Sequence, residues 1–350
     1  MPAPVAVLSV ATASPPHVLH QRDVAQAARM MFADRFPNFD RMAKVFLNAG
    51  IERRQSVRPI DWFFQPRGWT ERTEAYLEGA VDLFAQAAER ALDEAGLKGA
   101  DVDIIVTASS TGIATPSLEA RAMTRLGFRS DVARIPVFGL GCAGGCSGLA
   151  LAARLAAATP GAVVLFVTVE LCSLAFRLDE LTKANIVATA LFGDGAAACV
   201  LQAGGEGFAQ VEAFAEHTWP DTLDIMGWRV DPIGLGVIFA RAIPPFAEAH
   251  LRPAMETMLA RDGRTLDDVD RFICHPGGAK VIEALESALS IGQGRLDQER
   301  DVLADHGNMS APTVLFVLDR VRRAGLPTRS VLTALGPGFT ASTVTLRAAA

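Results

Sequence analysis

The chain has 350 residues, of which half are hydrophobic and 21% are charged, and its net charge is −6. This balance is typical of a globular protein with a large core, built as one large domain or as two fused halves. The lack of a basic field argues against nucleic-acid binding. No uncharged apolar run of about 18 residues is evident, so we expect no membrane span. Five cysteines are too few for a disulfide framework, which favours a reduced, cytoplasmic protein.

Apolar runs rich in β-branched residues alternate with helical patterns along the chain. The N-terminal stretch MPAPVAVLSVATASPPHVLH lacks a basic segment, so we expect a strand entering a loop and not a signal peptide. Further buried strands are predicted at 103–108, 134–138, 162–169, 196–201, 270–274, 330–335 and 342–347. Helices are predicted at 81–96, 117–127, 142–158, 245–261, 278–290 and 309–324. This alternation predicts an α/β fold with helices layered on a central sheet.

A faint internal repeat relates two halves of the chain. Each half contains a strand, a polar turn, a helix ending in Leu-Gly or Ile-Gly, and then a Gly-led helix start. Asp103 to Cys142 is 39 residues, and Asp270 to Asn308 is 38. We therefore expect two duplicated halves, 1–205 and 206–350, with Cys142 and Asn308 at equivalent places facing one cleft.

Cys142 lies in GLGCAGGCSGLALAARLAAA, where a strand and a glycine turn lead into a helix. A helix N-terminus favours negative charge, so we expect the thiol pKa to fall and the thiolate to act as a nucleophile. The alternative is a small buried residue. Gly144 and Gly145 disfavour helix and indicate close packing or an approaching substrate. No metal is expected, because Cys142 and Cys146 lack two further ligands at suitable spacing.

A nucleophilic cysteine needs a base or an ion partner. His275 is the best candidate, because it follows the apolar strand RFIC and precedes a Pro-Gly-Gly turn. His306, in ADHGNMS, is the alternative. Asn308 is expected to open a helix, either as a simple cap or as a site residue brought opposite Cys142 by the repeat.

The order of these three residues resembles that of the type III polyketide synthases, the chalcone synthase-like branch of the thiolase superfamily. The matching motifs are GCAGG (141–145), ALFGDGAAA (190–198), HPGG (275–278), GNMS (307–310) and GPGFT (336–340), with weaker similarity at 110–121. The resemblance implies a homodimer with the five-layered αβαβα thiolase fold. It implies no cofactor beyond its substrates, acyl-CoA and malonyl-CoA. Cys142 would carry the acyl chain, and His275 and Asn308 would hydrogen-bond the thioester oxygen during decarboxylation.

The resemblance also implies substrate-binding residues. Phe192 and Phe239 match two gatekeeping phenylalanines, with core packing as the alternative. The loop Gly336, Pro337 and Gly338 would shape the cyclisation cavity. Arg41 and Lys44 loosely resemble residues that bind coenzyme A phosphates, with plain surface charge as the alternative.

The chain departs from plant members at Thr115, Ala175 and Val230, which stand where those enzymes carry Met, Thr and Gly. Small side chains at 115 and 175 would leave room for a long chain. The stretches DWFFQPRGW and IMGWRVDPIGLGVIF resemble bacterial alkylpyrone and alkylresorcinol synthases. We therefore expect a long-chain fatty acyl starter. Cys146 is unusual beside the catalytic position, as a packing residue or a redox-sensitive neighbour.

Three alternatives stay open at the level of sequence. One is a type III synthase that uses a small starter. The second is a ketoacyl-acyl-carrier-protein synthase that initiates fatty acids, although its histidine usually precedes Gln-Ala-Asn and not Pro-Gly-Gly. The third is a non-catalytic binding or scaffold protein with a thiolase-like fold.

Overall fold

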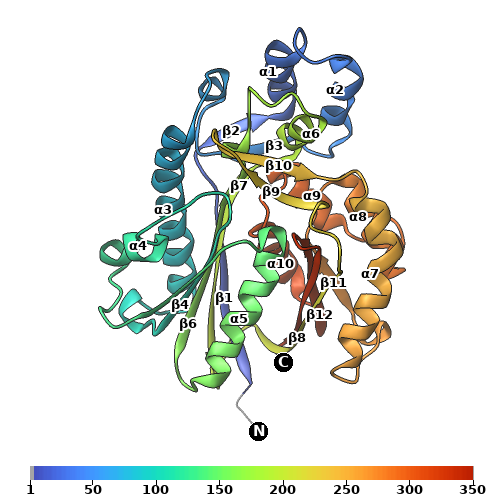
Figure 1. Ribbon diagram of the computed structural model, residues 1–350. Helices are drawn as coiled ribbons and strands as arrows, with labels where there is room; N and C mark the ends of the chain where they lie inside the picture. Colours follow the sequence, from blue (N-terminus) through green and yellow to red (C-terminus); the bar gives the residue numbers. More distant parts are fainter. Residues whose placement is uncertain (1–3, 350) are drawn as a thin grey trace.

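The computed structural model describes residues 4–349, which form one nine-stranded mixed sheet with helices on and between its two halves (Figure 1). The strand order is β5-β4-β6-β7-β1-β8-β13-β12-β11. The strands are β1 (Val5–Ala13), β4 (Ile104–Ala108), β5 (Ala133–Val137), β6 (Val163–Leu171), β7 (Asp194–Ala203), β8 (Ala209–Thr218), β11 (Arg271–Cys274), β12 (Arg329–Gly336) and β13 (Thr340–Ala348). All of the strands expected from the sequence are present.

The pairing of these strands confirms the internal repeat. In the first half β4 pairs parallel to β6, β6 antiparallel to β7, and β7 antiparallel to β1. In the second half β11 pairs parallel to β12, β12 antiparallel to β13, and β13 antiparallel to β8. The halves join where β1 pairs with β8 through Val5–Val7. The chain passes from one half to the other between Ala203 and Ala209.

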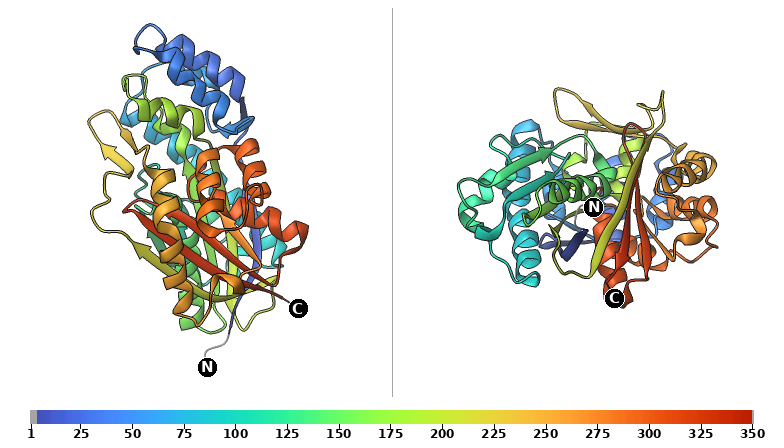
Figure 2. Two further views of the ribbon diagram at one scale, coloured as in Figure 1. Left: turned by 90° about the vertical axis from the view of Figure 1, so that its right-hand side faces the viewer. Right: turned by 90° about the horizontal axis from the view of Figure 1, so that it is seen from below.

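Five layers follow from the positions of the long helices. Helices α3 (Trp69–Glu94) and α4 (Leu118–Leu126) cover the outer face of the first half, and α7 (Ile243–Ala260) and α8 (Ala279–Leu289) flank the second. Helices α5 (Gly144–Ala158) and α10 (Thr313–Gly325) lie between the two halves and contact strands of both (Figures 1 and 2). This is the αβαβα arrangement expected from the sequence.

The glycines at the start of α5 allow this helix to pack closely on β6 and on the segment that leads into α10. A Cβ added to Gly145 would lie 2.3 Å from the Ala311 carbonyl oxygen, and one added to Gly148 would lie 2.4 Å from the Phe166 ring. The segment Gly141–Ala158 passes a length and composition test for a membrane span although it contains Arg154, and most of it is buried inside the protein. Its place as a central core helix accounts for its apolar composition.

Several elements were not anticipated from the sequence, and most gather at the top of the molecule in Figure 1. They are β2 (His17–His20), α1 (Gln21–Phe32), α2 (Phe39–Asn48), β3 (Arg53–Ser56), α6 (Lys183–Leu191), β9 (Met226–Val230), β10 (Leu235–Phe239) and α9 (Asp297–His306). Strands β9 and β10 form a hairpin apart from the nine-stranded sheet. Two helix boundaries also differ: α3 begins at Trp69 and not at 81, and α10 begins at Thr313 and not at 309.

Candidate active site

Cys142 lies in a single 3-10 turn, Gly141–Ala143, which leads directly into α5. Gly141 has a φ of +48°, and a Cβ there would lie 2.6 Å from Pro337 Cδ, so the turn packs tightly on the loop after β12. Cys142 is 8% exposed. The sequence expectation of a cysteine at the start of the central helix is confirmed.

The protonation of Cys142 differs from the sequence expectation. Burial raises the pKa of its thiol to about 11, and hydrogen bonds with Ser310 and Asn308 only partly offset this effect. The cost of moving a thiolate out of water therefore exceeds the favourable effect of the helix start in this closed pocket.

His275 follows β11, and its backbone N–H donates to the Thr333 carbonyl at 2.8 Å, which continues the parallel ladder between β11 and β12. The side chain is 4% exposed, and burial lowers the pKa of the imidazole to about 4. Neither ring nitrogen has a hydrogen-bond partner within residues 4–349. A buried polar group without a partner is rare, and here both ring nitrogens are available to a substrate.

Asn308 is not a helix cap, because α10 begins five residues later. Its backbone forms a parallel bridge to Phe192, with its N–H donating to the Leu191 carbonyl at 2.8 Å. The side-chain Nδ2 donates to the Gly277 carbonyl at 3.2 Å, and Oδ1 accepts from the Ser310 N–H at 2.8 Å. These contacts fix the amide and leave its second N–H hydrogen for a ligand.

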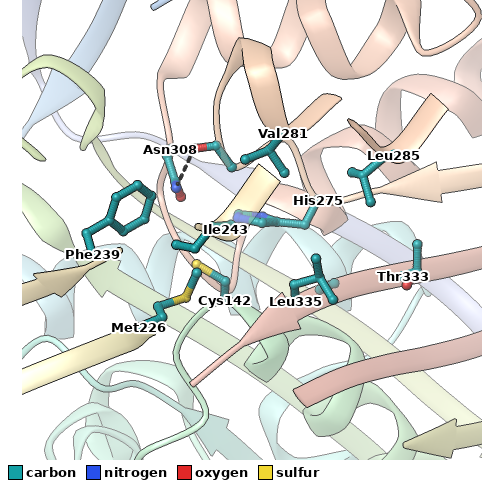
Figure 3. Close-up of a pocket in the computed structure, with 12 residues that line it drawn as sticks. Cys142, Met226, Phe239, Ile243, His275, Val281, Leu285, Asn308, Thr333 and Leu335 are labelled. Carbon is teal, nitrogen blue, oxygen red and sulfur yellow. Dashed lines mark hydrogen bonds between the residues drawn. The ribbon is translucent and has the colours of Figure 1, made fainter. Parts of the chain in front are cut away.

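Cys142, His275 and Asn308 line one cavity with an empty volume of about 380 Å³ (Figure 3). The other residues that line it are mainly apolar: Met226, Phe239, Ile243, Gly277, Val281, Leu285, Thr333, Ala334 and Leu335. The three polar side chains come from the 3-10 turn Gly141–Ala143, the end of β11 and the segment before α10, and they converge on this space. A thiol and two fixed hydrogen-bonding groups in an apolar pocket suit acyl transfer through a thioester.

A second cavity adjoins the first, and a third adjoins the second. The second, about 410 Å³, shares Cys142, Met226 and Phe239 with it. The third, about 500 Å³, shares Cys172 and Phe192 with the second. We refer to these as the catalytic, middle and distal cavities. The walls of the distal cavity are largely apolar, with Arg54, Ser173 and Thr189 as its polar members: Leu19, Val24, Ala27, Met31, Arg54, Ile60, Phe63, Cys172, Ser173, Phe176, Ala188, Thr189 and Phe192.

The expected gatekeeping phenylalanines lie at the junctions of these cavities. Phe192 lines the middle and distal cavities, and Phe239 lines the catalytic and middle ones. Their ring centroids are 6.4 Å apart with the rings at 90°. Of the loop after β12, Pro337 lines the middle cavity, while Gly336 packs on Ala143. Gly338 has a φ of +118° and turns the chain into β13.

The remaining expected substrate residues lie away from the walls of these cavities. Ala175 is buried in the turn Cys172–Ala175, whose first two residues line the cavities in its place. Thr115 is exposed, and Val230 is 71% exposed at the end of β9. Arg41 and Lys44 are exposed on α2. Their proposed roles stay predictions.

The structure places His306, the alternative partner for the thiol, and Cys146, the unusual second cysteine, outside the walls of the catalytic cavity. His306 ends α9, and its Nδ1 bonds with Gln55 Oε1 at 2.7 Å, outside the walls of the catalytic cavity. Cys146 is fully buried in the core cluster around α5. Within the described part of the chain, no group of three or more His, Cys, Asp or Glu side chains could hold a metal ion.

Comparison with known proteins agrees with this geometry. The model of the N-terminal domain of chalcone and stilbene synthases matches residues 66–205, and that of the C-terminal domain matches residues 210–350. The chain belongs to the chalcone and stilbene synthase family. It is therefore a type III polyketide synthase, an acyl-transferring enzyme, which decides against the ketoacyl synthase and scaffold alternatives.

Similar proteins include bacterial members of this family. A 1,3,6,8-tetrahydroxynaphthalene synthase of Streptomyces peucetius subsp. caesius is 40% identical over 351 residues, covering 97% of this synthase and 92% of the relative. The alpha-pyrone synthesis polyketide synthase-like Pks18 of Mycobacterium tuberculosis (strain CDC 1551 / Oshkosh) is 30% identical over 357 residues, covering 97% and 90%. The crystal structure of 1,3,6,8-tetrahydroxynaphthalene synthase from Streptomyces coelicolor A3(2) aligns with a TM-score of 0.93, 28% identity and 99% coverage of both chains.

Several residues around the site in this synthase were missed in the sequence. Met226 and Trp228 reach the cavities from the separate hairpin β9–β10, and Cys172 and Ser310 line the middle cavity. Glu170 is buried near Cys142, where it accepts hydrogen bonds from Ser110 and Thr111, and burial raises its pKa to about 7. The sequence did offer one signal for Glu170, because a glutamate near the end of an otherwise apolar buried strand needs hydrogen-bond partners.

Proposed function

We propose that this synthase loads a long-chain fatty acyl group from acyl-CoA onto Cys142, extends it with malonyl-CoA, and cyclises the product to an alkylpyrone or alkylresorcinol. The observation that carries the proposal is the distal cavity, whose walls are largely apolar and which shares Cys172 and Phe192 with the middle cavity that Cys142 lines. An acyl chain held there would exchange water contacts for apolar ones, and each buried methylene would stabilise binding by about 0.8 kcal/mol.

The chemistry proposed for the three polar residues follows from their protonation. With the pKa of Cys142 raised and that of His275 lowered, both side chains are neutral at pH 7. The thiol would therefore pass its proton to His275 during attack on the starter thioester, and coenzyme A would leave as the thiol. The His275 and Asn308 N–H groups would then stabilise the enolate oxygen formed when malonyl-CoA loses CO2.

Starters of graded length test the proposal. If the chain fills the distal cavity, kcat/KM should rise by up to about fourfold per added methylene until the cavity is full. Turnover restricted to acetyl, malonyl or aromatic starters would reject a long-chain starter and support a small one. Replacing Cys142 by Ala should abolish the acyl adduct seen by intact mass, and persistent labelling would reject Cys142 as the loading site.

A cavity-blocking variant separates the role of the distal cavity from general effects. Ala27 on α1 lines the cavity, whereas its neighbour Gln26 is exposed. Ala27→Phe should lower kcat/KM for long starters and spare short ones, while Gln26→Phe should behave as the parent enzyme. Equal loss for starters of all lengths would mean that the chain does not enter this cavity.

We also propose the homodimer and the cytoplasmic location expected from the sequence. An exposed apolar surface supports a dimer: Ile113 is 60% exposed and Phe138 is 62% exposed, beside the edge strand β5. Thr115 lies in the same loop as Ile113. Light scattering after chromatography tests this: Phe138→Asp should convert a dimer to a monomer, and a parent enzyme that is already monomeric would reject the dimer.

A further inference from the structure

The hairpin β9–β10 carries part of the cavity wall but does not belong to the main sheet. Met226, Trp228 and Phe239 lie on it and line the catalytic or middle cavity, and the Trp228 ring lies edge-on to Phe192 at 6.1 Å between centroids. The strands pair with each other and not with the nine-stranded sheet (Figures 1 and 2). The position of these side chains relative to Cys142 is therefore set by contacts made outside the sheet ladder.

Asp231 organises the turn of this hairpin. Its Oδ1 accepts from the backbone N–H groups of Ile233 at 2.9 Å and Gly234 at 3.1 Å. Its backbone carbonyl accepts from Trp69 Nε1 at 2.9 Å. These contacts and the neighbouring Arg177 guanidinium hold the pKa of Asp231 below its usual value, so the carboxylate is charged.

Arg177 joins this turn to the opposite wall of the cavities. Its side chain is only 4% exposed, and Nη1 lies 3.1 Å from both Asp231 carboxylate oxygens. Its Nε also donates to Asp179 Oδ1 at 2.7 Å. Arg177 comes directly after Phe176, which lines the distal cavity. Phe176 in turn follows the turn Cys172–Ala175, and Cys172 of this turn lines the middle cavity.

A second ion pair crosses the same gap. Arg229, on β9, lies 3.1 Å from Glu180 Oε1, and the Glu180 side chain is 6% exposed. The segment 177–180 and the hairpin are thus connected twice by charged groups. In each pair one partner is nearly buried, Arg177 in the first and Glu180 in the second, so breaking the pair would leave a buried charge without its partner.

We propose that the Arg177–Asp231 ion pair sets the spacing between the hairpin and the Cys172–Phe176 wall, and thereby controls how many malonyl units the growing chain receives. Arg177 is a positioning residue that acts through Trp228, which packs on Phe192, on the passage between the middle and distal cavities. The inference rests on the acyl-transfer activity of the family and not on the length of the starter.

Two variants test the proposal. Arg177→Met keeps an unbranched apolar side chain in place of the arginine stem and removes the guanidinium with its charge. Asp231→Asn keeps a side-chain oxygen for the Ile233 and Gly234 N–H groups and removes the charge that faces Arg177. In both we expect the ratio of products with different numbers of extensions to change by about tenfold, because small displacements near reacting atoms have large effects. The rate of malonyl-CoA decarboxylation should change much less, since Cys142, His275 and Asn308 are untouched.

A matched control removes a comparable ion pair far from the cavities. Arg322 is 16% exposed and bonds with Glu94 at 2.6 Å. Arg322→Met should lower the melting temperature and leave the product ratio unchanged. The proposal is overturned if Arg177→Met and Asp231→Asn behave like this control. If Arg177→Met fails to fold, Asp231→Asn alone decides. The ratio is measured with any starter that is turned over, so failure of long-chain starters leaves this test intact.

Discussion

Replacing Gly145 by Ala tests whether the close contact between the two central segments holds the site together. A Cβ at 145 would lie 2.3 Å from the Ala311 carbonyl oxygen and 2.6 Å from Val314 Cγ1. A backbone oxygen cannot swing aside as a flexible side chain can, so the segment 308–311 must shift. Alanine in a helix is favoured over glycine by about 1 kcal/mol, whereas overpacking costs about 1–3 kcal/mol and more against backbone.

We therefore expect Gly145→Ala to lower the free energy of unfolding by about 2 kcal/mol. Because the shift would also move Asn308, the rate of malonyl-CoA decarboxylation should fall by up to about 10²-fold for a displacement near 1 Å. Urea unfolding and single-substrate decarboxylation measure the two effects on the same preparation.

Gly144 provides the control on the same helix. There an added Cβ would lie 3.1 Å from Ala311 Cβ, a contact that relaxes with a movement of a few tenths of an ångström. Gly144→Ala should therefore be close to neutral in stability and activity. If the two variants have equal unfolding free energies and equal activities, the packing of Gly145 on Ala311 does not position Asn308.

Two further predictions concern the polar residues of the site. Burial raises the pKa of Cys142 to about 11 and lowers that of His275 to about 4. The rate of Cys142 alkylation by iodoacetamide should therefore rise about tenfold per pH unit from pH 7 to 10. A rate that is already constant at neutral pH would instead indicate a thiolate–imidazolium pair. Asn308→Ala removes one fixed hydrogen-bond donor and should slow malonyl-CoA decarboxylation, measured as CO2 release, by about 10²–10³-fold. The rate of Cys142 acylation by the starter should fall less. An equal fall in both rates would place Asn308 in binding and not in enolate stabilisation.

The main strands and the α/β alternation could be predicted from sequence because their signals are local. Buried strands such as 163–171 are continuous apolar runs, and the helix after Cys142 is uniformly small and apolar. Helices α1 and α2 were missed because their charged and apolar residues lie in a region without a repeat partner. The hairpin β9–β10 was missed because its strands pair with each other and not with the nine-stranded sheet, so the internal repeat gave no indication of it.

That Cys142, His275 and Asn308 line one cavity was predictable from the sequence, whereas the pKa of Cys142 was not. The spacing of the repeat brought Cys142 and Asn308 together, and the strand-end position indicated His275. The direction of the Cys142 pKa was wrong, because the helix start is a local feature whereas desolvation depends on every wall of the pocket. Thr115 and Val230 were expected to bind substrate because they match positions in plant family members. Both are exposed in the structure, and their exposure depends on loops whose path the sequence does not specify.

The duplication also explains why only one of two equivalent turns carries a reactive side chain. In the first half, the turn after β4 places Ser110 and Thr111 on Glu170 of the adjacent strand β6, where the Ser110 N–H and both hydroxyl groups donate to the carboxylate. In the second half, the turn after β11 places His275 beside β12, and both ring nitrogens lack partners within residues 4–349. Unpaired buried nitrogens cost stability. The same fold thus uses one turn for its own hydrogen bonding and leaves the ring nitrogens of the other without partners, as the role proposed for His275 requires.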